Sequence, residues 1–223
     1  MASPGRDVKL SKDRVTGNRN FITKIWSANN FLKLNNCKLD KKINLTSIKL
    51  PINHWIYNEF IKTQNLITKN IEIFRFDEAA RYAYQFVWHS YCDWYLEFLK
   101  PTFNSKNKIE INEAKTFSSF MMANILRILH PFIPFFTEKL WSLNAYKKIF
   151  NNFLICSSWP DFKIINKFSK NQNNINDLIE IISNIRSTKA ELKITPKLYC
   201  DIFFDEKSVK LKKLINKNII LIK

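Results

Sequence analysis

The sequence of this 223-residue chain predicts a mainly α-helical fold, in which a helical bundle is followed by a small α/β unit. Only two glycines occur, Gly5 and Gly17, whereas tight turns and phosphate-cradling loops usually need glycine because it adopts positive φ without strain. Hydrophobic residues make up 46% of the chain and include 19 phenylalanines, which is enough to build a packed core. Long segments with apolar residues at three- and four-residue steps, punctuated by proline, favour helices.

Two long helices are predicted in the first third of the chain. Residues 11–34 carry apolar side chains at helical spacing, with a serine and an aspartate available to cap the start. The stretch 35–47 is polar and rich in Lys and Asn, so we expect a connection there. A second helix should begin at Pro51, because proline suits the first helical turn, and should extend to Phe74.

The clearest helical pattern is the segment FDEAARYAYQFVWHSYCDWYLEFLK. Asp77 is placed to cap this third helix together with Arg75 at its start, and Pro101 is expected to end it. Asp93 and Glu97 lie four residues apart on the same helix. They indicate a helix face that makes salt bridges rather than a pair of carboxylates for acid/base catalysis.

Two further helices are predicted on either side of a proline-rich break. Residues 112–129 have helical apolar spacing, and the His130-Pro131 pair should end that helix. A short fifth helix is expected over 132–143, kinked or beginning near Pro134. His130 is interpreted as a capping or packing histidine at this break.

Beyond Lys147 the sequence changes in character and predicts the α/β unit. The pattern alternates between short apolar runs and polar stretches, which favours short strands around helices. The expected elements are an extended segment over 153–160, a polar connector over 162–174, a helix over 175–192, a strand over 198–205, a short helix over 205–217 and a second strand over 218–223.

The net charge of +17 indicates a polyanionic partner, because Lys and Arg release counterions from phosphates. Lys, Asn and Ile are all frequent and all have A/T-rich codons, so the charge by itself does not identify nucleic acid as that partner. The four cysteines are far apart and the three histidines show no paired spacing, which argues against a metal site and fits a reducing cytoplasm. No apolar run is long enough to span a bilayer.

Three segments resemble the anticodon-binding region of the valyl-tRNA synthetases, which are class I aminoacyl-tRNA synthetases. They are RNFITKIWSANNF at 19–31, RFDEAARYAYQFVWHSYCDWYLEFLKP at 75–101 and LRILHPFIPFFTEKLW at 126–141. The resemblance covers residues 3–196, and Ser27 departs from it, since the family usually has Asn there. The related isoleucyl enzymes share the bundle, but the DWYLE run looks valyl.

The resemblance implies an anticodon-binding helical bundle over 13–147, a link from an upstream domain over 1–12, and the α/β unit over 148–223. Lys9-Leu10-Ser11-Lys12 looks like the ATP-binding Lys-Met-Ser-Lys-Ser loop of these enzymes but lies in the link. The Gly-rich strand–loop–helix that would hold nucleotide phosphates is missing from the sequence.

The activity implied by the resemblance is the ATP-dependent joining of valine to its tRNA. Neither the catalytic nor the editing domain lies in these residues, so we expect no catalytic residue and no activity from this chain alone. ATP and Mg²⁺ would belong to the catalytic domain, and no cofactor is expected here. The expected partners are tRNA, specifically valine tRNA, and a separate catalytic domain.

Four residues are predicted to bind tRNA: Arg19, Asn20, Lys24 and Trp94. Asn20 and Lys24 lie one helical turn apart and can project together. The related methionyl enzymes have a similar Asn and Arg facing the anticodon, with a Trp from a later helix that Trp94 matches by position. Arg19 could hold a phosphate or could pair with an acid such as Asp13.

Structural interpretations of the same residues stay open at this point. Trp94 could be a core aromatic, Asn20 a surface amide or buried hydrogen-bonder, and Lys24 a solvated lysine. For the whole chain, two alternatives to an anticodon-reading module are a non-discriminating tRNA-binding or docking subunit and a structural helical interaction protein. An exposed apolar face without RNA affinity would indicate the last.

Overall fold

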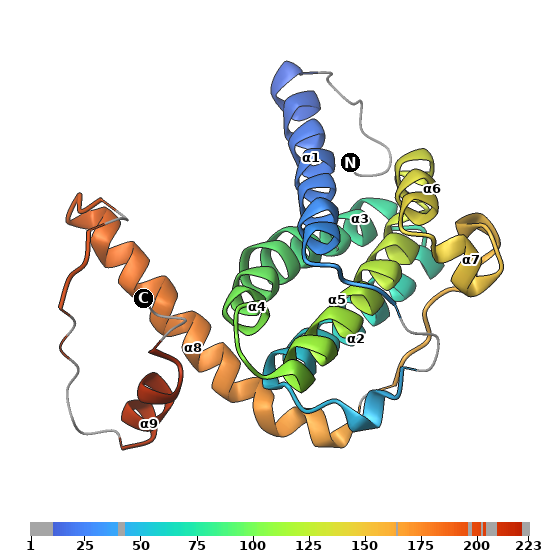
Figure 1. Ribbon diagram of the computed structural model, residues 1–223. Coiled ribbons are helices and arrows are strands. Elements are labelled where there is room, and N and C mark those ends of the chain that lie inside the picture. The colour runs from blue at the N-terminus through green and yellow to red at the C-terminus, as the bar shows by residue number, and fades with distance from the viewer. Residues whose placement is uncertain are drawn as a thin grey trace.

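The elements of the fold are α-helices joined by short turns, as the computed structural model in Figure 1 shows. The structure describes residues 11–39, 43–163, 165–195, 198–201, 203 and 209–219. Within these ranges there is no strand. The helices are α1 (Lys12–Leu34), α2 (Pro51–Glu72), α3 (Phe76–Gln85), the π-helix η2 (Phe86–Tyr95), α4 (Leu96–Phe103), α5 (Lys108–Leu129), α6 (Pro134–Leu143), α7 (Tyr146–Phe150), α8 (Asn166–Glu191) and α9 (Val209–Lys217), with 3-10 turns η1 (Leu45–Ser47) and η3 (Leu154–Cys156).

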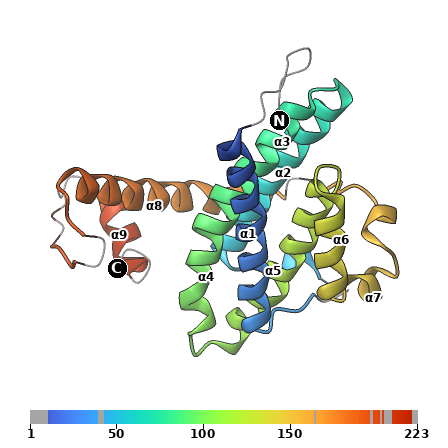
Figure 2. The ribbon, with the colours of Figure 1, turned by 90° about the horizontal axis from the view of Figure 1, so that it is seen from above.

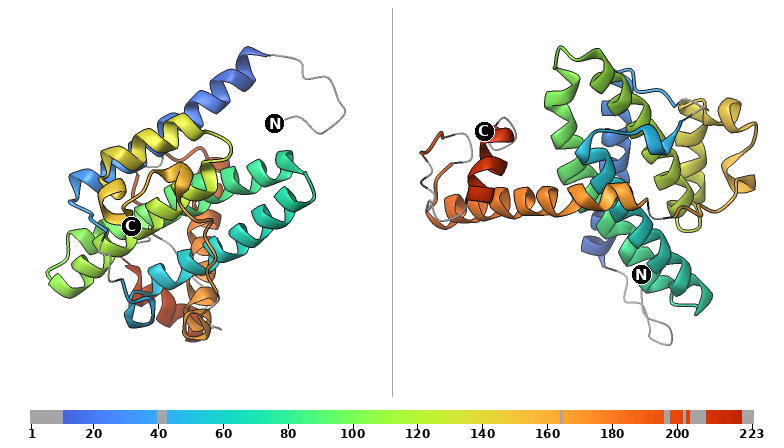
Figure 3. Two further views of the ribbon diagram at one scale, coloured as in Figure 1. Left: turned by 90° about the vertical axis from the view of Figure 1, so that its right-hand side faces the viewer. Right: turned by 90° about the horizontal axis from the view of Figure 1, so that it is seen from below.

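Helix α2 lies at the centre of the bundle and packs against α3, η2, α5 and α8. Figure 3 shows α2 and α3 as an antiparallel hairpin whose turn projects to one side of the molecule. Helix α8 starts against α2 and extends away from the bundle, with α9 beside its outer part (Figures 1 and 2). None of the helices in the described ranges is both long and apolar enough to cross a membrane.

The core is built from aromatic and aliphatic residues, as the composition predicts. Tyr57, Phe60, Tyr91, Tyr95 and Trp141 are among its fully buried side chains. Aromatic side chains bury large apolar areas, so they supply much of the driving force for packing these helices together.

A buried polar network fixes where α2 begins. The Glu113 carboxylate of α5 accepts hydrogen bonds from the backbone N–H groups of Lys49 (3.0 Å) and Leu50 (2.8 Å) and from the Asn53 amide (3.0 Å). Asn53 in turn accepts a hydrogen bond of 2.9 Å from the Tyr95 hydroxyl of η2. Leu50, the N-cap residue of α2, makes no side-chain cap. The Glu113 carboxylate of α5 instead satisfies backbone N–H groups at this helix start.

The first two predicted helices are confirmed, as α1 and α2. The third is confirmed in position but differs at both ends. Arg75 is the N-cap residue, and Asp77 pairs with the Arg75 guanidinium (3.1 Å) instead of capping the helix, which lowers the pKa of the Asp77 carboxyl. Pro101 does not end the helix, which continues to Phe103. It lies in the last turn, where a missing N–H removes a single ladder bond.

The proline-rich break is confirmed in detail. Helix α5 ends at Leu129, and α6 starts with Pro134 in its first turn. His130 packs at this break with its Nδ1 atom 2.9 Å from the Thr137 hydroxyl, and burial lowers its pKa. The start of α5 differs from the prediction: the helix begins four residues earlier than expected, where the Asn107 side chain caps it.

The predicted α/β unit is not shown. The segment 153–160 contains the 3-10 turn η3 instead of an extended strand, and the short helix α7 precedes it. Residues 198–201 and 203 are irregular, so the predicted strand over 198–205 does not form at its described positions. A strand without a neighbouring strand leaves its backbone groups unpaired, and none lies beside this segment within the described ranges.

Other predictions for this part of the chain have mixed outcomes. The helix over 175–192 is confirmed but begins at Asn166, inside the predicted connector, because Phe168 is buried and stacks on His54 with 3.9 Å between ring centroids. The short helix predicted over 205–217 is confirmed as α9 over its described part, and residues 205–208 lie outside the described residues. Most of the second strand, 220–223, and most of the predicted link, 1–10, lie outside the described residues. The domain boundaries stay predictions.

The Glu113 network generates a stability prediction. Glu113→Ala should lower the free energy of unfolding by about 2 kcal/mol, because two backbone N–H groups and the Asn53 amide lose their acceptor. Urea unfolding followed by circular dichroism measures this effect. Glu110→Ala, which removes an exposed carboxylate one turn away on α5, is the matched control and should change the free energy far less. Equal effects of the two substitutions would contradict the capping role.

Candidate nucleic-acid interface

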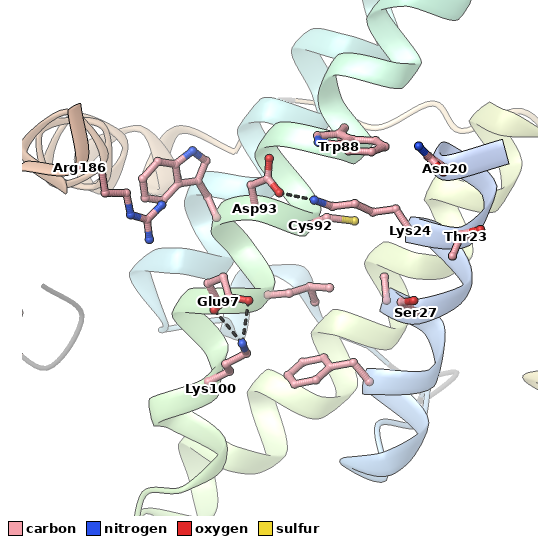
Figure 4. A pocket seen from close by; sticks show the side chains of 14 residues that line it. Asn20, Thr23, Lys24, Ser27, Trp88, Cys92, Asp93, Glu97, Lys100 and Arg186 are labelled. Atoms are coloured by element: carbon pink, nitrogen blue, oxygen red, sulfur yellow. Dashed lines mark hydrogen bonds and ion pairs between the residues drawn. The ribbon is translucent and has the colours of Figure 1, made fainter. Parts of the chain in front are cut away.

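An open groove of about 840 Å³ lies between α1, the η2–α4 segment and α8. Figure 4 shows its lining side chains converging from these three directions. Helix α1 supplies Asn20 and Lys24, η2 supplies Trp88, Asp93 and Trp94, and α8 supplies Arg186 among the lining side chains. The groove is therefore assembled from parts of the chain that are far apart in the sequence.

Three of the four predicted tRNA-binding residues line this one groove. Asn20 and Lys24 face it from α1, as their one-turn spacing predicted, and Trp94 faces it from η2. Arg19 is exposed on α1 and is not among the residues that line the groove. Its backbone carbonyl accepts a hydrogen bond from Thr23. The structure thus brings together Asn20, Lys24 and Trp94, and leaves Arg19 outside the groove.

Lys24 is held at the centre of the groove and is not a freely solvated lysine. Its ammonium group lies 2.5 Å from Asp93 Oδ1 and 4.5 Å from the centroid of the Trp88 ring. The other carboxylate oxygen of Asp93 lies 3.4 Å from His89 Nδ1. The prediction that Asp93 serves a salt-bridging helix face is confirmed, and its partner is a residue 69 positions away in the sequence.

Trp94 is part core and part groove wall. Its ring packs on Phe98 with 5.7 Å between centroids and is partly buried against the core. The Arg186 guanidinium lies 5.0 Å from the centroid of the Trp94 ring. This cation–π contact makes Arg186 of α8 a defined wall of the groove.

Sequence reasoning missed an aromatic cluster at the end of the groove near Asn20. Tyr84 and Trp88 stack with 5.5 Å between centroids, and Phe21 lies 4.8 Å from Tyr84. The recurrence of aromatic residues at positions 84 and 88, one helical turn apart, is the sequence signal that could have located this cluster. Tyr84 is in fact exposed and Trp88 lines the groove.

The groove has stacking surfaces, hydrogen-bonding groups and one thiol. Cys92 also lines it, and burial raises the pKa of the Cys92 thiol to about 12, so the thiol is not activated as a nucleophile. Across the described part of the chain, no group of three or more His, Cys, Asp or Glu side chains is placed to hold a metal ion.

Two ion pairs line the groove together with Arg186. The ammonium groups of Lys24 and Lys100 pair with the carboxylates of Asp93 and Glu97, respectively. A groove that existed only to hold phosphates would gain nothing from carboxylates. Paired charges between indole rings instead suit flat heterocycles that carry both donors and acceptors on their edges.

Comparison with known proteins agrees with this arrangement. The family described as the anticodon-binding domain of tRNA ligase matches residues 53–204. The chain belongs to this family. The matched range includes η2 with Trp94 and α8 with Arg186, whereas Asn20 and Lys24 on α1 lie before it.

Individual relatives extend the similarity over α1. The chain is 45% identical over 223 residues to the valine–tRNA ligase of Pelagibacter ubique, covering all of this chain and 25% of that protein. It is 40% identical over 195 residues to the valine–tRNA ligase of Brucella suis, covering 87% of this chain and 21% of that protein. The chain therefore spans a quarter or less of the length of these relatives, and it resembles the anticodon-binding part of a valyl-tRNA synthetase.

The position of Trp94 gives a prediction that separates its two interpretations. Trp94→Ala should leave the bundle folded and lower the free energy of unfolding by only about 1–2 kcal/mol, because one side of the ring faces the groove. Trp141→Ala, at a fully buried indole, should cost about 3–5 kcal/mol. Thermal unfolding of the two variants beside the unaltered chain makes the comparison. Loss of folding in Trp94→Ala would show that Trp94 is a core residue and would remove it from the site.

Proposed function

We propose that this chain is the tRNA-binding module of a valine–tRNA ligase and that its groove receives the anticodon of valine tRNA. The observation that carries the proposal is the convergence of Asn20, Lys24 and Trp94 in one open groove of an anticodon-binding family member. The relatives named above are valine–tRNA ligases, which supports valine tRNA as the partner.

The groups in the groove match the needs of single-stranded RNA. Splayed loop bases stack on aromatic side chains and present their edges to polar groups, and the indoles of Trp88 and Trp94 offer such surfaces. The Asn20 amide carries both a donor and an acceptor, the combination that pairs with adenine. We propose that Arg19, which lies outside the groove on the same helix, holds a phosphate of the bound loop.

Because the chain spans a quarter or less of these relatives, we divide the steps of aminoacylation between this chain and the rest of the ligase. This chain contributes recognition of the tRNA, while activation of valine with ATP and Mg²⁺, and editing, belong to the rest of the ligase. We assign the module to the cytoplasm, where its four free cysteines would stay reduced. Purified chain that catalysed valine-dependent exchange of pyrophosphate into ATP would overturn this assignment.

A protein-docking role is a second candidate, favoured by an apolar corner in which Phe76, Pro131 and Phe132 line one pocket and Phe74 packs on Phe76 with 6.2 Å between ring centroids; exposed Phe135 follows Phe132 in the chain by three residues. Phe135 is 91% exposed and Phe74 is 73% exposed, which is unusual for side chains of this size. The part of the ligase that would dock on this corner is the remaining three quarters of the ligase polypeptide. The corner and the groove share no lining residue, so both roles can coexist. Absence of RNA affinity would leave docking as the function.

The proposal is tested by binding of the purified chain to a valine tRNA anticodon stem-loop at near-physiological salt. Every valine anticodon ends in A-C, so replacing either base should weaken binding by about 1–3 kcal/mol. Asn20→Ala and Trp94→Ala should weaken the native loop more than the altered loops, since they remove a base contact. Arg19→Ala should weaken all loops alike and flatten the salt dependence.

Trp26→Ala is the matched control for these variants. Trp26 lies on α1, as Asn20 does, but it is exposed and does not line the groove. Its removal should leave binding of every loop unchanged. Equal affinity of the unaltered chain for native and altered loops would refute anticodon reading and would leave a non-discriminating RNA-binding surface.

A further inference from the structure

A carboxylate at the centre of an RNA-binding groove needs an explanation. The chain carries a net charge of +17, and every carboxylate in the groove repels the phosphates that the basic residues attract. Asp93 nevertheless lies at the heart of the groove, with about a third of its side chain (35%) open to solvent. Because Asp93 weakens phosphate binding in the groove, we look for another role of its carboxylate there.

The position of Asp93 suits contact with the edge of a base. Figure 4 shows its carboxylate in the groove beside Lys24, and Trp88 and Trp94 of the same helix also line the groove. Trp94 follows Asp93 in the chain, and the Trp88 ring lies 4.5 Å from the Lys24 ammonium group that pairs with Asp93, so a base stacked on either indole would lie near this carboxylate. Lys24 holds one of its oxygens and His89 lies beside the other, so the carboxylate is fixed in orientation before any ligand arrives.

The carboxylate also retains free hydrogen-bonding capacity. An ionised carboxylate accepts about four hydrogen bonds through its two oxygens and donates none. The contacts with Lys24 and His89 occupy one site on each oxygen. The remaining sites can accept hydrogen bonds from amino groups, whereas a carbonyl oxygen in the same place would be repelled.

Adenine and cytosine both carry an exocyclic amino group where inosine and uracil carry a carbonyl oxygen, and valine anticodons end in A-C. We propose that Asp93 reads the anticodon by accepting a hydrogen bond from the exocyclic amino group of one of these two bases. This inference rests on the proposed function and deepens it. Lys24 then has a double role: it orients the Asp93 carboxylate and keeps a cation near the backbone of the bound loop.

Glu97 lies one turn further along and provides a matched comparison. Its carboxylate also lines the groove, but both of its oxygens lie 2.7 Å from the Lys100 ammonium group, and Figure 4 shows Glu97 farther from Trp88 than Asp93 is. Removing either carboxylate changes the charge of the groove by the same amount. Only the removal of Asp93 should change which bases are accepted.

The experiment measures binding of three stem-loops: the native valine loop, one with the adenine replaced by purine, and one with the cytosine replaced by pyrimidin-2-one. Each replacement deletes only the amino group. The unaltered chain should bind at least one of the two altered loops roughly tenfold more weakly than the native loop, and the loop whose penalty disappears in Asp93→Ala identifies the base that Asp93 contacts.

Asp93→Ala should abolish that difference between loops and should bind the altered loop at least as tightly as the unaltered chain does, because a repelling charge is gone. Glu97→Ala should raise affinity for all loops and keep the tenfold difference. Asp93→Asn, whose amide can donate to a carbonyl oxygen, should reduce the penalty for a loop with uracil in place of cytosine. Circular dichroism spectra of all variants verify that each is folded.

Two outcomes overturn the inference, and they are distinguishable. If the unaltered chain discriminates the amino groups and Asp93→Ala does so equally well, another group reads the bases and the proposed function stands. If the unaltered chain binds loops with any replaced anticodon base equally, the proposed function fails and the role of Asp93 fails with it.

Discussion

The position of the groove depends on the hydrogen bonds that the Glu113 carboxylate accepts. It ties α5 to the start of α2, and through Asn53 it reaches the Tyr95 hydroxyl of η2. Tyr95 is fully buried, and burial raises its pKa well above the usual value, so the hydroxyl stays protonated and keeps donating. The residue before Tyr95 is Trp94. A polar network inside the bundle therefore sets where the groove residues of η2 stand on its surface.

Helical spacing carried much of the prediction from sequence, and its failures share a cause. The spacing located α1 and α2 and placed Asn20 and Lys24 on one face, because these are properties of a single helix. It could not give the start of α8, since Phe168 is helical through packing on His54, more than a hundred residues away. It also missed the π-helix, because side-chain spacing does not distinguish i→i+4 from i→i+5 bonding over one or two turns.

The groove was predictable in its members but not in its chemistry. Family resemblance identified Trp94, and one-turn spacing identified Asn20 with Lys24. The pairing of Lys24 with Asp93 and the stacking of Arg186 on Trp94 join helices that are distant in sequence, so no local pattern announces them. These contacts give the residues roles that the sequence did not predict: Lys24, expected to face the anticodon, holds a carboxylate, and Arg186 stacks on an indole.

The contribution of α8 shows why the groove depends on more than the helices that carry the family motifs. Helix α8 is anchored to α2 by the 2.8 Å hydrogen bond from Trp55 Nε1 to Asn176 and by the stack of Phe168 on His54. These anchors lie near its first half, whereas Arg186 lies near its outer end. The last buried side chain of α8 is that of Ile182, four residues before Arg186, so Arg186 can shift with little disturbance of the core. The wall of the groove that covers Trp94 is therefore the one best able to move aside when a base stacks there, while the Lys24–Asp93 pair, set by the bundle, stays in place.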